Sequence, residues 1–134
     1  MVSKTTVRVE FSIFGKNFDP DQITEELGIM PTQTYKEGDL LKNGKNTRKE
    51  TVWEISTDYE DSIDINEQID KVVRILADKS EKIKELKDRL YLNTLFMILI
   101  YAEKNDLPAI YLTKSFIHLA GDIDAEIGFD TYVY

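Results

Sequence analysis

A strict alternation of apolar and polar residues marks the first strand of the chain. Every second position is apolar in the series Val7, Val9, Phe11 and Ile13. A period of two predicts a β-strand that is buried on one face and solvated on the other. The alternation returns at residues 51–57 and predicts a second strand, in which Trp53 is a core anchor.

Helical signals follow each of these strands. Asp19 is a candidate N-cap and Gly28 suits a left-handed C-terminal position, so residues 20–27 are predicted to form a short helix. From residue 65 onward, apolar residues keep helical spacing. Residues 78–80 interrupt this pattern, which predicts two helices, the first capped by Asp64 and the second by Ser80.

The last third of the sequence mixes strand and helix signals. Residues 91–101 are apolar on both faces, which places them in the middle of a sheet. Residues 109–113 indicate a shorter strand, followed by a helix with Gly121 just past its end and by a closing strand over residues 125–134. The order β-α-β-α(α)-β-β-α-β predicts an α+β fold of ferredoxin-like kind. Its sheet is antiparallel or mixed, with helices packed on one face.

Composition narrows the class of protein. A length of 134 residues with 42% hydrophobic residues predicts one domain over residues 1–134. The chain has no Cys, which excludes disulfides, thiolate metal sites and cysteine nucleophiles. The most apolar run, residues 95–102, is far shorter than the roughly 20 residues of a membrane-spanning helix. The N-terminus lacks the apolar core of a signal peptide, and we therefore expect a cytoplasmic protein that does not bind membranes.

The charge of the chain bears on its partners. A net charge of −8 disfavours nucleic acid, because the phosphate backbone would be repelled. It is compatible with a basic protein partner, although the same charge also keeps a small protein soluble. Self-association as a homodimer stays open.

A long loop stands out against this acidic background. Residues 32–50 lack apolar periodicity and are predicted to form a surface loop or loose hairpin, a length that is often functional. Its basic residues are candidates for holding an anion: Lys36, Lys42, Lys45, Arg48 and Lys49. The stretch from Gly38 to Lys45 is not a phosphate loop, because its spacing is one residue too long and the Ser/Thr is missing.

The C-terminal segment carries the opposite charge. If it is extended from residue 122, a period of two puts four carboxylates on one strand face. Such a face would repel itself unless a cationic group lay opposite, so we consider it a surface for a protein partner. The candidate partner-binding residues are Asp122, Asp124, Glu126, Asp130, Tyr132 and Tyr134.

Catalytic and metal-binding chemistry has little support in the sequence. His118 is the only histidine, and no residue that would orient it as a general base can be identified. The acidic residues after Asp122 do not have the Gly and Glu positions of a calcium-binding loop. We expect no catalytic residue, no metal site and no cofactor.

Several blocks of sequence together resemble a known family. The most specific is Phe18-Asp-Pro-x-x-Ile-Thr-x-x-Leu-Gly-Ile-x-Pro-Thr32, preceded by Phe11-x-Ile-x-Gly15 and followed by Gly38-Asp39, Trp53 and residues 119–132. Over nearly its whole length the chain resembles the uncharacterised bacterial family catalogued as domain of unknown function 4279. The resemblance implies a small cytoplasmic protein without an established activity. Members of this family are also similar in character to some immunity proteins, which neutralise secreted toxins of competing bacteria.

Three functions follow from these observations. The leading hypothesis is a non-enzymatic interaction module, in its most concrete form an immunity-type inhibitor that binds a basic toxin domain through residues 122–134. The alternative is a regulatory domain that binds a small anionic ligand in the loop 36–49. A hydrolase would require His118.

Overall fold

Two ten-residue strands, β1 (Thr6–Gly15) and β5 (Asn93–Ala102), pair antiparallel at the centre of the sheet. The computed structural model, which describes residues 4–134, gives the strand order β2-β3-β1-β5-β6, with the short β4 (Glu60–Asp61) pairing with β1. On one side of this pair, β3 (Thr51–Ser56) is antiparallel to β1 and to the edge strand β2 (Gln33–Tyr35). On the other side, β6 (Glu126–Val133) is parallel to β5, so the sheet is mixed.

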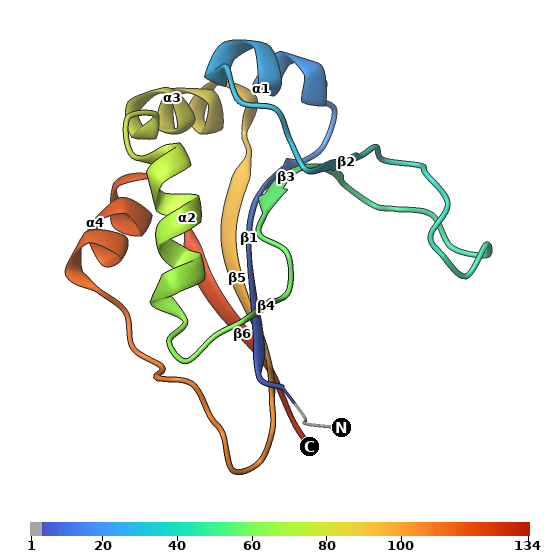
Figure 1. Ribbon diagram of the computed structural model, residues 1–134. Coiled ribbons are helices and arrows are strands. Elements are labelled where there is room, and N and C mark those ends of the chain that lie inside the picture. Colours follow the sequence, from blue (N-terminus) through green and yellow to red (C-terminus); the bar gives the residue numbers. More distant parts are fainter. Residues whose placement is uncertain (1–3) are drawn as a thin grey trace.

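All four helices of the described chain lie on one side of this sheet (Figure 1). They are α1 (Pro20–Leu27), α2 (Asn66–Leu76), α3 (Ser80–Leu90) and α4 (Lys114–Asp122). The α+β class, the mixed sheet and the single layer of helices are therefore confirmed. None of the helices within residues 4–134 has the length and hydropathy needed to cross a membrane.

The predicted signals of α1 are confirmed in detail. The carboxylate of Asp19 accepts a hydrogen bond from the backbone N–H of Asp21, and Gly28 ends the helix with a φ of 68°. Trp53, buried on β3, donates its indole N–H to the hydroxyl of Thr24 at 3.0 Å. One side chain thus fills the core and fixes α1 to the sheet, as expected for a buried tryptophan that needs a partner for its N–H.

The helical side of the sheet holds the hydrophobic core. The alternation in β1 buries every second side chain beneath the helices, as the pattern predicted. At the centre, the ring of Phe96 lies 4.8 Å from that of Phe11 and 4.9 Å from that of Phe116, measured between centroids. These contacts join two strands to α4, so packing of α4 depends on the aromatic residues of the sheet.

Three local predictions are wrong. Residues 109–113 form only an isolated bridge, from Ala109 to Asp64, rather than a strand. Ser80 is the first helical residue of α3, not its cap, whereas Asp64 does accept the N–H of Asn66 at the start of α2. Gly121 lies inside α4, because Ile123 is buried and extends the apolar stripe of the helix.

The long segment between β2 and β3 is an ordered hairpin. The backbones of Leu40 and Thr47 form a bridge, and Gly38 and Gly44 adopt positive φ angles at its bends. At the tip, the side chain of Asn43 accepts hydrogen bonds from two backbone N–H groups. The hairpin projects away from the helices (Figure 1), so it lies on the side of the sheet that they leave uncovered.

Candidate functional site

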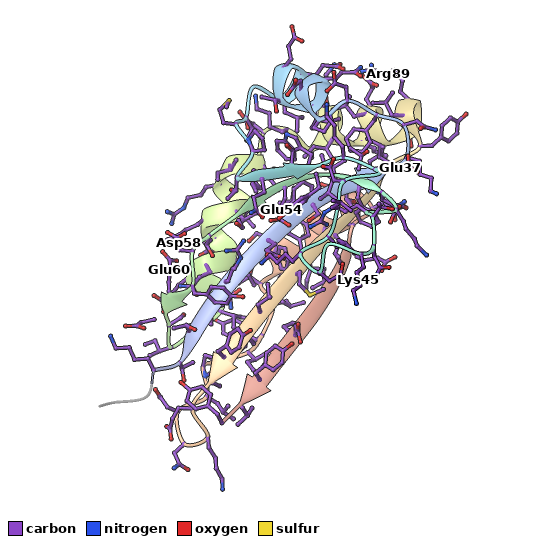
Figure 2. All side chains as sticks on the ribbon, turned by 90° about the vertical axis from the view of Figure 1, so that its right-hand side faces the viewer. Glu37, Lys45, Glu54, Asp58, Glu60 and Arg89 are labelled. Atoms are coloured by element: carbon purple, nitrogen blue, oxygen red, sulfur yellow. The ribbon has the colours of Figure 1, made fainter. Side chains whose placement is uncertain are left out.

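The face of the sheet opposite the helices is the candidate site, and we call it the open face. Its side chains alternate with the buried core residues of the same strands, so each points away from the helical layer. Figure 2 shows this face, with Glu54 on it and Asp58 and Glu60 at its border. The residues of the open face considered below are Arg8, Glu10, Ser12, Glu54, Ser56, Leu95, Met97, Leu99, Tyr101, Glu126, Asp130 and Tyr132; Phe14 and Val52 lie on the same face.

An apolar strip runs along the middle of the open face. Strand β5 contributes Leu95, Met97 and Leu99, all half-buried. Met97 lies beside Gly128 of β6, where an added Cβ would come within 3.0 Å of the methionine methyl. The missing side chain at Gly128 therefore lets Met97 cover two strands. Methionine suits such a position, because its flexible side chain adapts to different partners.

Carboxylates flank the apolar strip on both sides. Glu10 and Glu54 lie on the β1–β3 side, and Glu126 and Asp130 on the β6 side. The only basic residue of the open face is Arg8, and it is fully engaged. Its guanidinium contacts the carboxylate of Glu10 at 3.0 Å, the hydroxyl of Ser56 at 3.0 Å and the carboxylate of Glu54 at 3.8 Å. The open face is therefore acidic even after this internal pairing.

Glu54 is the most perturbed acid of the open face. Burial raises its pKa above the ordinary value, and the nearby carboxylate of Glu10 raises it further. Arg8, a 3.3 Å hydrogen bond from Ser12 and the charge of Arg48 lower the pKa without cancelling these effects. The ionised form of Glu54 thus lacks part of the stabilisation that water would give it, and an added cation would restore it.

Three tyrosines gather at one end of the open face. The rings of Tyr101 and Tyr132 stack with centroids 4.9 Å apart, and Tyr59 meets Tyr101 edge-on at 5.4 Å. The guanidinium of Arg8 lies over Tyr59, and the hydroxyl of Tyr132 donates to Asp130. Burial, then Tyr101, raises the pKa of Tyr59, and the charge of Asp130 raises that of Tyr132, so both hydroxyls remain donors at neutral pH.

The structure divides the predicted partner-binding residues into three groups. Glu126, Asp130 and Tyr132 lie on the open face. Tyr134 follows the end of β6, where its hydroxyl donates to the carbonyl of Lys4. Asp122 ends α4 and Asp124 lies in the turn before β6, so the prediction of one strand face from residue 122 is wrong.

The turn before β6 has a definite cause. Asp124 adopts a φ of 53°, and the N–H of Ala125 donates to the carbonyl of Ala120. This left-handed reversal ends α4 in place of the expected glycine, since aspartate tolerates the conformation better than most residues. The ammonium group of Lys87 donates to the carbonyls of Ile123 and Asp124, which fixes the turn to α3.

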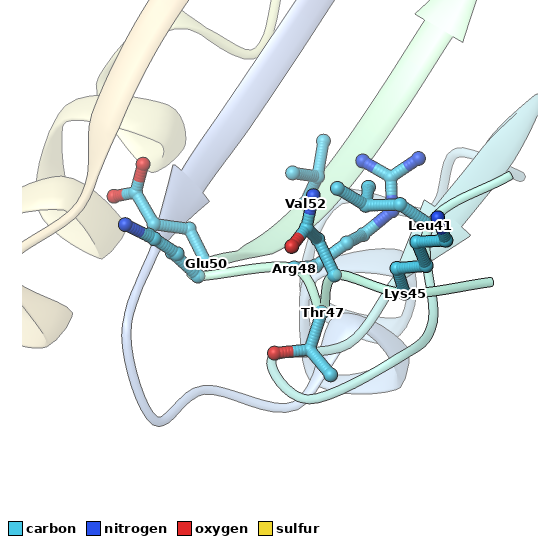
Figure 3. A pocket seen from close by; sticks show the side chains of 8 residues that line it. Leu41, Lys45, Thr47, Arg48, Glu50 and Val52 are labelled. Atoms are coloured by element: carbon cyan, nitrogen blue, oxygen red, sulfur yellow. The ribbon is translucent and has the colours of Figure 1, made fainter. Parts of the chain in front are cut away.

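The predicted anion-binding residues lie on the hairpin. A hollow of about 730 Å³ is lined by Lys45, Arg48 and Lys49, together with uncharged residues and Glu50 (Figure 3). Lys36 and Lys42 are not among its lining residues. The guanidinium carbon of Arg48 lies 3.5 Å from the ring centroid of Tyr35, which holds Arg48 in place by a cation–π contact.

His118 is exposed on α4, the side of the sheet opposite the open face. Within residues 4–134, no hydrogen bond orients its ring, and no group of three or more His, Cys, Asp or Glu side chains is placed to hold a metal ion. A general base would need such a partner.

Sequence reasoning assigned only Glu126, Asp130 and Tyr132 of the open face to a site, and it missed the residues that β1, β3 and β5 contribute. Its polar residues on β1 and β3 were visible as the solvated positions of two alternating strands, but nothing indicated that Glu10 and Glu54 face the same apolar strip as Asp130. Tyr59 and Tyr101 lie 42 residues apart in the chain and meet only through the pairing of strands around β1. The one available signal was the excess of carboxylates at the outward positions.

Comparisons with known proteins agree with the sequence resemblance. No curated protein and no solved structure matches the chain. The sequence model of one family, described as a domain of unknown function (DUF4279), matches residues 4–134. This match covers nearly the whole chain and includes both the capped helix α1 and the closing strand β6. The protein therefore belongs to the DUF4279 family.

Proposed function

We propose that this protein is a non-enzymatic interaction module whose open face binds a basic protein. In its most specific form the proposal is an immunity-type inhibitor, which neutralises a basic toxin domain by covering its surface. The observation that carries the proposal is the arrangement of the open face: an apolar strip on β5 between two rows of carboxylates.

This arrangement has the anatomy of a protein interface. Specific interfaces have an apolar centre, a polar rim and an excess of tyrosine and methionine. Met97 supplies an adaptable centre, and Tyr101 and Tyr132 supply aromatic area at one end. Carboxylates at the rim would steer a basic partner and reject an acidic one. The net charge of −8 acts in the same direction at longer range.

Glu54 gives the open face a reason to bind a cation. Because burial raises its pKa, its ionised form lacks stabilisation in the free protein. A lysine or arginine of the partner placed beside Glu54 would compensate that charge. The interaction would be stronger than a pair on open surface, where the median contribution is about 0–1 kcal/mol.

The experiment begins with capture of the partner from the native host on immobilised protein. Binding of the purified partner is then measured by titration calorimetry for two charge reversals of equal size. Asp130→Lys changes the open face, whereas Asp122→Lys changes the end of α4. We expect Asp130→Lys to weaken binding by about tenfold or more, and Asp122→Lys to leave it within about twofold.

A third variant separates charge from contact. Met97→Ala removes the centre of the apolar strip without changing the charge, and we expect it to accelerate dissociation. Equal effects of Asp130→Lys and Asp122→Lys would reject the open face as the binding surface. A partner of acidic composition, or binding that is insensitive to salt, would reject the basic-partner proposal as a whole.

The hairpin supports a second candidate function, the binding of a small anion. Lys45, Arg48 and Lys49 line one hollow, and Arg48 is held by Tyr35. A thermal-shift measurement with inorganic pyrophosphate tests this function, with Lys104→Ala as a matched loss of charge elsewhere. We expect pyrophosphate to raise the melting temperature of the wild type but not of Arg48→Ala. No shift for the wild type would remove this candidate.

A further inference from the structure

The two edges of the sheet differ in how well they are protected from pairing. The edge strand β2 has three residues, and short edge strands offer little to pair with. The other edge strand, β6, has eight residues without Lys, Arg or Pro, and its register with β5 contains no bulge. Within residues 4–134, no strand pairs with the outer edge of β6. Its unpaired backbone therefore forms a ready template for another strand.

The hydrogen bonds of Tyr134 show which backbone groups are free. Its N–H donates to the carbonyl of Ala102, and its carbonyl accepts from the N–H of Lys104. In a parallel pair, alternate residues make both of their bonds to the same neighbour. Even-numbered residues of β6 thus bond to β5, and the N–H and C=O groups of Ile127, Phe129, Thr131 and Val133 point outward.

Outward groups at odd positions fit a second copy of β6 in antiparallel orientation. A two-fold axis at Phe129 pairs this residue with its own copy and pairs Ile127 with Thr131 of the other copy. All of these residues have outward backbone groups, so they form reciprocal hydrogen bonds of the antiparallel type. The Phe129 side chain, 46% exposed in a single chain, would then be covered by its counterpart.

The side chains select this register over its neighbour. With the axis at Phe129, Asp130 lies opposite Gly128 and Glu126 lies opposite Tyr132, so no carboxylate lies directly opposite another. With the axis at residue 130, Asp130 would face its own copy, and like charges directly opposite each other are destabilising. Two registers pair most of the length of β6, with the axis at residue 129 or at residue 130. Only the register centred on residue 129 avoids a carboxylate opposite its own copy.

We propose that the protein forms a two-fold symmetric homodimer through antiparallel pairing of β6 with β6, centred on Phe129. The pairing joins the sheets of two copies into one and places their open faces side by side. It does not rest on the proposed function of the open face. If both hold, the dimer binds two partner molecules.

Charge makes the dimer sensitive to salt. Two chains that each carry a net charge of −8 repel each other, and salt screens this repulsion. Self-association should therefore strengthen as the salt concentration rises. Binding of a basic partner would weaken under the same conditions, so the two interactions respond to salt in opposite directions.

Sedimentation equilibrium of the full chain tests the dimer. At concentrations from about 1 to 100 µM, we expect a mass twice the 15.5 kDa of one chain. Thr131→Pro removes an outward N–H without breaking the pairing with β5, and should weaken the dimer by about tenfold or more. Thr131→Val keeps the N–H and should remain dimeric. A monomeric wild type over this range, or a Thr131→Pro variant that stays fully dimeric, would overturn the proposal.

Cross-linking tests the register without relying on a proline. The chain has no Cys, so any disulfide in a single-cysteine variant joins two chains. With the axis at Phe129, Phe129→Cys brings two sulfurs together, whereas Thr131→Cys leaves its Cα atoms roughly 13 Å apart along the strands. We expect oxidation to cross-link Phe129→Cys and not Thr131→Cys. Equal cross-linking of both, or of neither, would reject this register.

Discussion

The two faces of one sheet behave differently although the same strands build both. On the helical face, β5 contributes Phe96, fully buried between the rings of Phe11 and Phe116. One residue later on the open face, Met97 is only half-buried and no helix lies above it. The helical face also satisfies its polar groups internally, as the indole of Trp53 does through Thr24. Among the described residues, Arg8 is the only cation that forms an ion pair with the carboxylates of the open face.

This difference separates residues that fold the protein from residues available to a partner. Burial against helices contributes roughly 1.5–3 kcal/mol for each large apolar side chain. Half-buried side chains on the open face contribute less to folding, so their identity is less constrained by stability. Apolar and acidic residues on an uncovered face therefore need another explanation, and the partner binding that we propose would supply one.

The largest expected effect is on the helical face. Phe96→Ala removes the ring that joins β1 to α4 and should lower the free energy of unfolding by about 3–5 kcal/mol. Met97→Ala, the adjacent residue on the open face, should cost only about 1 kcal/mol. Urea denaturation of both variants measures the two losses of unfolding free energy. Similar losses for Phe96→Ala and Met97→Ala would show that the helical face does not contribute more to stability than the open face.

The next largest effect on stability is expected at the stacked tyrosines Tyr101 and Tyr132. Tyr132→Ala removes the ring that stacks on Tyr101 and should lower the free energy of unfolding by about 0.5–1.5 kcal/mol. Tyr132→Phe keeps the stack and loses only the hydroxyl bond to Asp130, so its thermal denaturation should match that of the wild type. A loss in Tyr132→Phe as large as in Tyr132→Ala would contradict a role of stacking.

Glu54 gives a smaller effect with a defined pH dependence. Its pKa is raised in the folded state from a usual value of 4.5, so the folded protein binds the proton more tightly than the unfolded chain does. Its contribution to stability is therefore lost as pH rises from about 4.5 through the raised pKa. Glu54→Gln should be more stable than the wild type at pH 7 and less dependent on pH.

Urea denaturation between pH 4 and pH 8 checks this prediction. Glu54→Ala is the control, because it removes the charge together with the hydrogen bond from Ser12 and should not show the same gain. A Glu54→Gln variant that is less stable than the wild type at pH 7 would show that Arg8 stabilises the carboxylate more than burial destabilises it.

The smallest effect concerns an ion-pair cluster between α1 and α3. Arg89, Gln22 and Lys82, in decreasing order, lower the pKa of Glu26 to about 2. Because this pKa is depressed, the stabilisation is present above the usual value of 4.5 and is lost as pH falls towards 2. Glu26→Gln should therefore show a shallower loss of stability in acid than the wild type.

An acid titration followed by circular dichroism measures this difference. Glu25→Gln is a matched control, since Glu25 forms no ion pair within the described residues. Added salt should reduce the difference between Glu26→Gln and the wild type, because exposed charges are screened. A Glu25→Gln curve identical to that of Glu26→Gln would contradict a specific role of the cluster.

Much of the fold could be predicted because its signals are local. The alternation in β1 identified its four buried apolar residues, Val7, Val9, Phe11 and Ile13, and Asp19 with Gly28 identified both ends of α1. The end of α4 could not be predicted from Gly121, because burial of Ile123 outweighed the preference of glycine for a helix end. That burial depends on the sheet beneath the helix.

The candidate site was predicted only in part for a related reason. Period-two spacing indicates which residues of one strand share a face, and it correctly placed Asp130 and Tyr132 on the same face. It does not state which strands are neighbours. Glu10 and Glu54 could therefore not be linked to Asp130 before the pairing of β1, β3, β5 and β6 was known.

Spacing and capping along the chain were enough to predict the two long central strands, the four helices and the family, but not the bridge at Ala109 or the short strand β2. Tertiary structure alone decided that one face of the sheet has no helices, that acids from three strands flank the strip on β5, and that β6 lies at an edge. The physical reason is that strand pairing joins distant residues through backbone hydrogen bonds, which are nearly the same for every amino acid.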